Sequence, residues 1–179
     1  MKLIYTGTQG TGKSTILRKT PIENKITEVV RNLSQKGIKI NRDGDAEGQQ
    51  IIFDTYRSLL SQDGDWVSDR GLTDVLAYTI YLQSHEKDSE KRQKLTSVMM
   101  SQLKDLMKYN KEHQDVIYVY FPIEFPVVGD GVRDVDETYR ADIDKLIVSL
   151  LSMSGAHYIT ITGKVEERLN TIYNLIGTV

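Results

Sequence analysis

Short apolar runs alternate with longer amphipathic segments along this chain. Each run is apolar at nearly every position, which is typical of a strand in a parallel sheet that is covered on both faces. The pattern predicts five such strands, at residues 3–6, 38–41, 66–68, 116–121 and 158–162.

Apolar residues between these runs recur three and four positions apart, which is the spacing of a helix. The pattern predicts helices within residues 22–33, 72–79, 99–107, 139–150 and 165–176. Because strand and helix alternate throughout, the predicted fold class is α/β, with three layers: a mostly parallel five-stranded sheet and helices on both of its faces. Ligands of such sheets collect at the carboxyl ends of the strands.

The most specific chemical signal follows the first predicted strand. Residues 7–14 read GTQGTGKS, a complete G-x-x-x-x-G-K-[ST] phosphate-binding loop. Such a loop is the turn between a strand and a helix, where consecutive backbone N–H groups converge on a polyphosphate. We therefore expect the three-layer fold to be that of a P-loop NTPase, with ATP as the nucleotide.

The residue types in this loop suit phosphate chemistry. Its three glycines permit positive φ angles and a close approach of the backbone to phosphate oxygens. Lys13 is expected to reach the β and γ phosphates, and the Ser14 hydroxyl to ligate a magnesium ion that bridges them. The expected nucleotide contacts in this segment are Gly7, Gly10, Thr11, Gly12, Lys13, Ser14 and Thr15.

A second polar site follows the strand predicted at residues 66–68. Asp69 and Arg70 come directly after it, so they lie at the same sheet edge as the phosphate loop if the two strands are neighbours. Asp69 is predicted to hold magnesium or to accept a proton from the attacking hydroxyl, and Arg70 to clamp a phosphate or the acceptor. The alternative is an ion pair that caps the following helix.

A third polar cluster, residues 41–48, follows the strand predicted at residues 38–41. Its carboxylates can remove a proton or accept hydrogen bonds from sugar hydroxyls, and Asp43 is the predicted general base. In the alternative interpretation Gly44 makes a turn and Asp45 caps the next helix.

Two later segments complete the candidate site. Residues 122–137 contain prolines and glycines and predict a long lid loop. Arg133 on this loop, and Arg140 on the next helix, are expected to close over the phosphates, unless they are ordinary surface arginines. Gly163 and Lys164, where the last helix begins, are expected to pack against the ring of the nucleotide, or else to form a plain turn.

Length and composition limit the kind of protein. The 179 residues fit a single domain, and 39% apolar with 27% charged residues is the balance of a globular protein. The formal charge of −2 gives no overall attraction to nucleic acid or to an anionic membrane. The chain has no cysteine, and its histidines lack metal-ligand spacing. A strand is predicted within two residues of Met1 and no apolar run approaches ~18 residues, so we expect a cytoplasmic protein.

These residues together resemble the P-loop nucleoside and nucleotide kinases, and the chain looks closest to the small phage and bacterial kinases that include ribosylnicotinamide kinase. The resemblance rests on four segments: residues 7–14, the R-D-G-D element at 42–45 that is similar to the R-E-P-G of thymidylate kinases, S-D-R-G-L-x-D-V-L-A-Y at 68–78, and D-G-V-R-x-x-D-E at 130–137. It implies that Lys13 and Ser14 hold the donor, that Asp69 and Arg70 serve the acceptor and metal, and that Arg133 belongs to the lid.

The expected function is an ATP- and Mg²⁺-dependent transfer of the γ-phosphoryl group to a small-molecule nucleoside or nucleoside monophosphate. A hydroxyl of DNA or RNA, terminal or on a hydroxymethyl base, is an alternative acceptor that the acidic balance disfavours. An ATP-hydrolysing regulatory switch is the alternative without an acceptor. Neither a membrane nor a fixed oligomeric state is implied.

Overall fold

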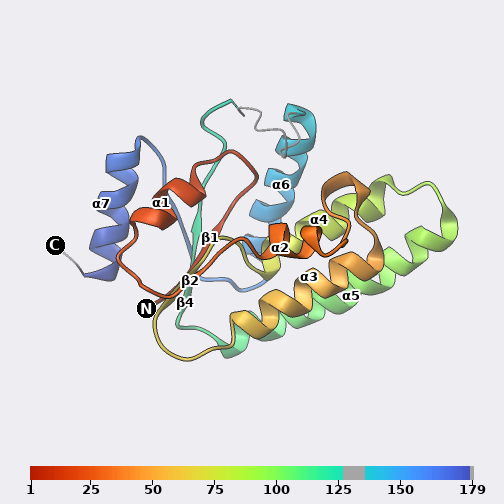
Figure 1. Ribbon diagram of the computed structural model, residues 1–179, viewed down its shortest axis with the longest axis horizontal. Coiled ribbons are helices and arrows are strands. Elements are labelled where there is room, and N and C mark those ends of the chain that lie inside the picture. The colour runs from red at the N-terminus through yellow and green to blue at the C-terminus, as the bar shows by residue number, and fades with distance from the viewer. Residues whose placement is uncertain (127–135, 178–179) are drawn as a thin grey trace.

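The computed structural model describes residues 1–126 and 136–177, and in this part of the chain five parallel strands form one sheet (Figure 1). The order across the sheet is β2-β3-β1-β4-β5, so the first strand is central and lies between β3 and β4. The strands are β1 (Lys2–Thr6), β2 (Lys25–Ile26), β3 (Trp66–Ser68), β4 (Val116–Tyr120) and β5 (Tyr158–Thr160).

Helices cover both faces of this sheet, as the sequence predicts. Helices α1 and α7 lie on one face, and α3, α4, α5 and α6 lie on the other (Figure 1). The helices are α1 (Lys13–Lys19), α2 (Val29–Gln35), α3 (Ala46–Leu59), α4 (Leu72–His85), α5 (Ser89–Glu112), α6 (Glu137–Met153) and α7 (Val165–Ile176), with a 3-10 turn η1 (Asn41–Asp43) before α3.

The two hydrophobic clusters follow from the alternation of side chains along the strands. In β1, Leu3 and Tyr5 point into the cluster beneath α1 and α7, whereas Ile4 points into the larger cluster on the opposite face. In β3 the larger cluster receives Trp66 and the smaller one Val67. The central strands are therefore apolar on both faces, which is why they read as continuous runs.

The prediction of a strand at residues 38–41 is wrong. The edge position is taken by β2, whose Lys25 and Ile26 pair with Val67 and Ser68 of β3. Ile38 and Ile40 instead pack against the larger cluster from the connection between α2 and η1. An Ile-x-Ile pattern indicates that alternate side chains are buried. Here the two isoleucines are buried from a loop that packs against α3, and not from a strand of the sheet.

The helix predicted from residue 22 begins only at Val29. Ile22 belongs to the smaller cluster and Ile26 to the larger one, on opposite faces of the sheet. A helix would place residues four apart on the same side, so this pair requires a turn and a short strand.

Helix α3, which lay outside the predicted helices, begins after Asp45, whose carboxylate accepts the N–H of Gly48 at 2.9 Å. This contact confirms the capping role that was the alternative for Asp45.

No helix in the two described ranges is long and apolar enough to cross a bilayer.

Phe121, directly after β4, lies close to the first glycine of the phosphate loop, and this contact predicts the effect of a substitution on stability. Gly7 has a φ of 140°, and a Cβ at this position would lie 2.5 Å from the carbonyl oxygen of Phe121. Backbone strain and overpacking each cost about 1–3 kcal/mol, so we expect Gly7→Ala to lower the free energy of unfolding by about 3 kcal/mol in urea titrations.

Gly64 offers a matched control for this variant. Its φ is also positive, at 82°, but nothing lies within 4 Å of a Cβ there. Gly64→Ala should therefore cost only about 1–2 kcal/mol from the left-handed backbone. Equal losses for the two variants would contradict the steric account of Gly7.

Candidate functional site

The phosphate loop has the backbone conformation that its glycines predict. It connects β1 to α1, and φ is positive at Gly7 (140°), Gly10 (72°) and Gly12 (89°). A side chain is disfavoured at each of these angles, and at Gly7 the carbonyl of Phe121 leaves no room for one. The roles expected for these three glycines in shaping the loop are thus visible in the backbone itself.

Lys13 lies buried inside this loop. Its Nζ donates to the carbonyl oxygens of Gly7 at 2.7 Å and Thr8 at 2.6 Å, and lies 3.3 Å from the hydroxyl of Thr11. The ammonium is therefore held at the concave side of the loop by main-chain oxygens. A cation in this position can attract the anionic tail of a nucleotide without leaving the loop.

Ser14 and Asp69 meet as the sequence predicts. The Ser14 hydroxyl donates to Oδ2 of Asp69 at 3.1 Å, because β1 and β3 are neighbouring parallel strands whose carboxyl ends share an edge. A hydroxyl and a carboxylate oxygen are ligands that Mg²⁺ accepts, together with phosphate oxygens and water. These two residues therefore fit a magnesium ion that is shared with phosphates. The described residues contain no group of three or more His, Cys, Asp or Glu that could hold a metal.

Asp74 joins the two parts of the site, and sequence reasoning did not select it. This carboxylate is fully buried and accepts the N–H of Gly7 at 3.2 Å and that of Gly71 at 3.0 Å. Burial raises its pKa, while the positive charges of Arg70 and Lys13 act in the opposite direction. Asp74 thereby ties the turn that carries Asp69 and Arg70 to the start of the phosphate loop.

The loop and this turn open into one cavity of about 530 Å³. Arg70 lies in its wall, with Nη1 3.4 Å from the Tyr78 hydroxyl and Cζ 5.5 Å from the centre of that ring. The described residues that line the cavity are residues 9–15 and Arg18, Val30, Arg31, Ser34, Gln35, Ile40, Asn41, Gln49, Ile52, Asp69, Arg70, Asp74, Val75 and Tyr78.

Other predicted residues lie elsewhere. Asp43 is exposed in η1 and is not among the described residues that line the cavity. Gly163 has a φ of 89° and donates its N–H to Glu124, and Lys164 is exposed where α7 begins. Arg133 and most of the predicted lid, residues 127–135, lie outside the described residues. The roles expected for these residues remain predictions.

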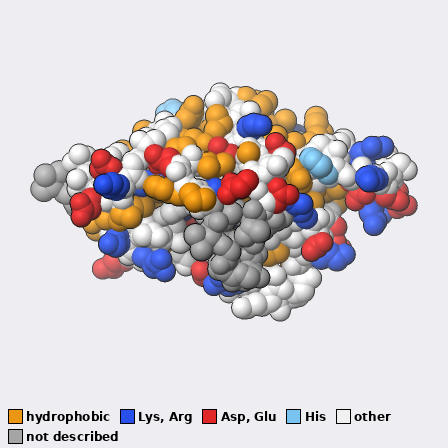
Figure 2. Space-filling model, turned by 90° about the horizontal axis from the view of Figure 1, so that it is seen from above, with side chains coloured by type: hydrophobic (Ala, Val, Ile, Leu, Met, Phe, Trp, Pro, Cys, Tyr) orange, Lys and Arg blue, Asp and Glu red, His pale blue; other side chains and the backbone are white. Residues whose placement is uncertain are grey.

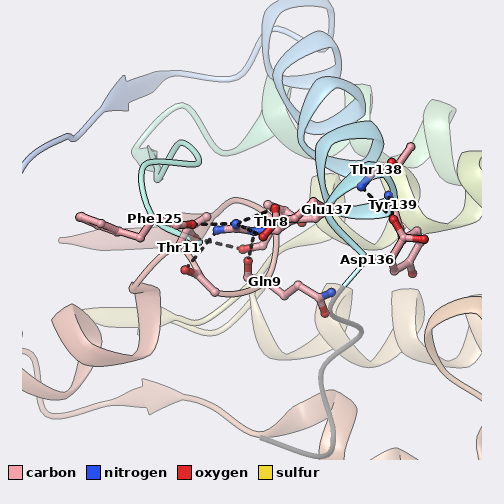
Figure 3. A network of polar contacts seen from close by, with 10 residues as sticks. Thr8, Gln9, Thr11, Phe125, Asp136, Glu137, Thr138 and Tyr139 are labelled. Atoms are coloured by element: carbon pink, nitrogen blue, oxygen red, sulfur yellow. Dashed lines mark hydrogen bonds and ion pairs between the residues drawn. The ribbon is translucent and has the colours of Figure 1, made fainter. Parts of the chain in front are cut away.

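Arg140 is completely buried, and its guanidinium contacts backbone carbonyl oxygens of the phosphate loop. Its Nε donates to the carbonyl of Gln9 at 2.9 Å, its Nη2 to that of Gly10 at 3.3 Å and its Nη1 to that of Phe125 at 2.7 Å. Figure 3 shows Thr8, Gln9 and Thr11 of the loop grouped with Phe125 and Glu137 around the same polar contacts. The expected contact of Arg140 with the nucleotide remains a prediction, whereas its contact with the loop backbone is direct.

A second buried arginine holds the other end of the loop. Arg168 of α7 donates from Nη1 to the carbonyl of Thr11 at 2.6 Å, and its Nη2 is paired with Glu124. Glu124 also accepts the N–H of Gly163 at 3.0 Å, so one carboxylate joins the arginine to the turn before α7. Although burial opposes its charge, these two partners hold the pKa of Glu124 below its usual value.

The sequence selected Arg140 for a different contact and did not select Arg168, but the burial of both could have been predicted. Arg140 lies three residues before Ile143, and Arg168 lies four before Ile172, so each falls on the apolar face of its helix. A charged side chain on such a face needs buried partners. Those partners are backbone carbonyls, and because carbonyls are present at every residue, the pattern alone does not identify them.

The contact between Arg168 and Thr11 generates a prediction about nucleotide affinity. A hydrogen bond to a charged group contributes about 1.5–3 kcal/mol, so Arg168→Gln should raise the Kd for ATP-magnesium by about tenfold or more in calorimetry. Arg168→Lys keeps one donor and the charge, and should recover part of the loss.

The control for this variant is Arg57→Gln. Arg57 makes ion pairs with Asp54 and Asp105 at the surface of α3 and α5, away from the loop. Its replacement should leave the Kd unchanged. A folded Arg168→Gln protein that binds ATP as tightly as the wild type would contradict the role given to Arg168.

Comparison with solved structures identifies the fold. The Bacillus subtilis YorR protein, in complex with phosphorylated GDP, is 18% identical at a TM-score of 0.61, covering 99% of this chain and 96% of YorR. Deoxyadenosine kinase from M. mycoides is 14% identical at a TM-score of 0.61, covering 99% of both chains. The NadR protein in complex with NR is 14% identical at a TM-score of 0.66, and this chain spans 99% of its own length and 51% of NadR.

These likenesses show a shared fold, and they confirm at that level the predicted resemblance to P-loop nucleoside and nucleotide kinases. No curated protein sequence matches the chain. Its sequence matches the AAA_28 family, described as an AAA domain, over residues 2–168, and the chain belongs to this family.

Proposed function

We propose that this protein is an ATP- and magnesium-dependent kinase that moves the γ-phosphoryl group to a nucleoside or nucleoside monophosphate. The observation that carries the proposal is that the phosphate loop and the turn with Asp69 and Arg70 open into one cavity of about 530 Å³. Donor and acceptor can therefore meet inside it.

The phosphate loop binds the donor in this proposal. Backbone N–H groups of residues 10–15 face the phosphates, and Lys13 neutralises charge on the β and γ groups. A magnesium ion, when bound, would withdraw charge from the phosphoryl oxygens, and Ser14 with Asp69 would hold it. Gly163, Lys164 and the lid with Arg133 would lie on the nucleotide side, and Arg140 would support the phosphate loop through its backbone carbonyls.

The acceptor enters from the side of α2, α3 and α4. Arg70 orients its reactive oxygen, and Asp69 accepts a proton if that oxygen belongs to a hydroxyl. We give this role to Asp69 before Asp43, because Asp69 lines the cavity and Asp43 is exposed in η1. The substrates are ATP and a small nucleoside or nucleotide, and the proposed location is the cytoplasm.

The solved neighbours support a nucleoside-type acceptor. One is a deoxyadenosine kinase solved with its products dCMP and dCDP, and another, NadR, is solved with NR. A long nucleic acid acceptor has less support. On the face shown in Figure 2, acidic and basic side chains are interspersed, and the described residues visible there form no continuous basic surface.

The activity prediction compares the wild-type protein with two variants. Purified protein with ATP-magnesium and a panel of nucleosides and nucleoside monophosphates should release ADP with at least one acceptor. Lys13→Ala and Asp69→Asn should each lower kcat/KM by about 10²–10³-fold, because each removes charge stabilisation at the transferring group.

Lys19→Ala is the control, since Lys19 is an exposed lysine at the end of the same helix and outside the cavity wall. ADP release that no acceptor stimulates would support an ATP-hydrolysing switch instead. Label from γ-³²P-ATP that appears only in added DNA or RNA would support a polymer acceptor. Either result would overturn the proposal.

A further inference from the structure

The charges that line the cavity differ from those of the whole chain. Four basic side chains and two acidic ones line it among the described residues, whereas the chain as a whole has a formal charge of −2. Lys13 belongs to the phosphate loop and serves the donor. The other three cations are Arg18, Arg31 and Arg70.

Both carboxylates of the cavity already have partners. Asp69 accepts the Ser14 hydroxyl, and Asp74 accepts two backbone N–H groups and lies close enough to Arg70 to interact with its charge. Arg31 pairs with Glu28 at 3.2 Å, but both side chains are more than half exposed, and such pairs contribute little. In the described part of the chain Arg18 has no ion-pair partner. The cavity therefore keeps an excess of positive charge.

Two helices bring this charge to the lining of the cavity. Ser14 and Arg18 are four residues apart on α1, so they share a face of that helix. On α2 the residues that line the cavity are Arg31, Ser34 and Gln35, at the i, i+3 and i+4 spacing of a single face. The two helices together bring two guanidinium groups, a hydroxyl and an amide to the cavity. These groups are donors that bind phosphate oxygens.

Apolar side chains also line the cavity, and such side chains can cover a flat ring. They are Val30, Ile40, Ile52, Val75 and Tyr78. An occupant that matches both kinds of lining side chain carries an aromatic base and an anionic group.

The acids of the cavity point to the same kind of acceptor. A hydroxyl acceptor has to lose a proton, which requires a general base. Asp69 and Asp74 are the two carboxylates among the described residues that line the cavity. Asp69, the base for a hydroxyl acceptor, also accepts the Ser14 hydroxyl, and Asp74 accepts two backbone N–H groups. A phosphate, with a second pKa of about 6, already presents an unprotonated oxygen at neutral pH.

We propose that the acceptor is a nucleoside 5′-monophosphate whose phosphate is bound by Arg18 and Arg31, in preference to a neutral nucleoside. The inference rests on the proposed kinase function and narrows its acceptor. In the reaction, an acceptor phosphate oxygen forms a bond to the γ-phosphorus of ATP while the bond from that phosphorus to the β–γ bridging oxygen breaks. The products are ADP and a nucleoside diphosphate.

The test is calorimetric binding of matched pairs, each a deoxynucleoside and its 5′-monophosphate, to protein saturated with AMP-PNP-magnesium. Saturation keeps the monophosphate out of the phosphate loop. For at least one base, we expect the monophosphate to bind about tenfold or more tightly than the nucleoside, since charge-assisted hydrogen bonds to arginine are lost without the phosphate.

Two variants and one control locate the effect. Arg18→Gln and Arg31→Gln should each weaken monophosphate binding by about tenfold and leave nucleoside binding unchanged. Arg92→Gln, which removes the same charge from the exposed start of α5 outside the cavity wall, should change neither. Variants that weaken both ligands alike, or nucleosides that bind as tightly as monophosphates, would overturn the inference, and so would the absence of binding by either ligand.

Product analysis by ³¹P NMR separates this inference from the broader function. Transfer to nucleosides and monophosphates with equal kcat/KM would uphold the kinase function and overturn the preference. Selective monophosphate binding that is lost in both arginine variants, with no transfer from ATP, would uphold the phosphate site and overturn the kinase function.

Discussion

The backbone of residues 7–12 is the constraint on which the rest of this structure depends. A loop that directs successive N–H groups toward a phosphate has to direct its carbonyl groups elsewhere, and buried carbonyls need donors. Here the donors are charged side chains from outside the loop: Arg140 on α6 and Arg168 on α7, with Lys13 inside. The loop is thus held in shape by three buried cations before any ligand is considered.

This arrangement explains why both arginines are buried although burial of a charge is costly. Each is paired with an acid, Arg140 with Glu137 and Arg168 with Glu124, and each also donates to main-chain oxygens. Buried charges are tolerated when they are paired and hydrogen-bonded in this way. The helices that carry them cover opposite faces of the sheet, so the loop is held from both sides.

The order of the strands positions the residues on the acceptor side of the cavity. Because β1 lies beside β3, the turn after β3 reaches the start of α1, and Asp69 meets Ser14. Asp74 then fixes this turn to Gly7. The cavity that results is positively charged within a slightly acidic protein, which shows that the charge of a site depends on which side chains the fold collects and not on the total.

Much of this molecule was predictable from local pattern. The phosphate loop, the central strands and most of the helices depend on residues close together in sequence, through glycine conformations and apolar spacing. The position of Asp69 at the same sheet edge as the phosphate loop also followed, because parallel strands end at a common edge. The edge strand was misplaced, since residues 25–26 are too short to give a periodic signal and residues 38–41 give one for a different reason.

What the sequence by itself determined is that this chain forms a phosphate-binding loop on an α/β sheet, because the glycines and the strand before them act locally. Only the tertiary structure decided which distant side chains support that loop and line its cavity. Arg168 and Thr11 are 157 positions apart, and Arg140 and Gln9 are 131 apart. Contacts of this kind depend on how helices pack across the sheet, and a backbone carbonyl carries no residue type by which a sequence could identify it as the partner.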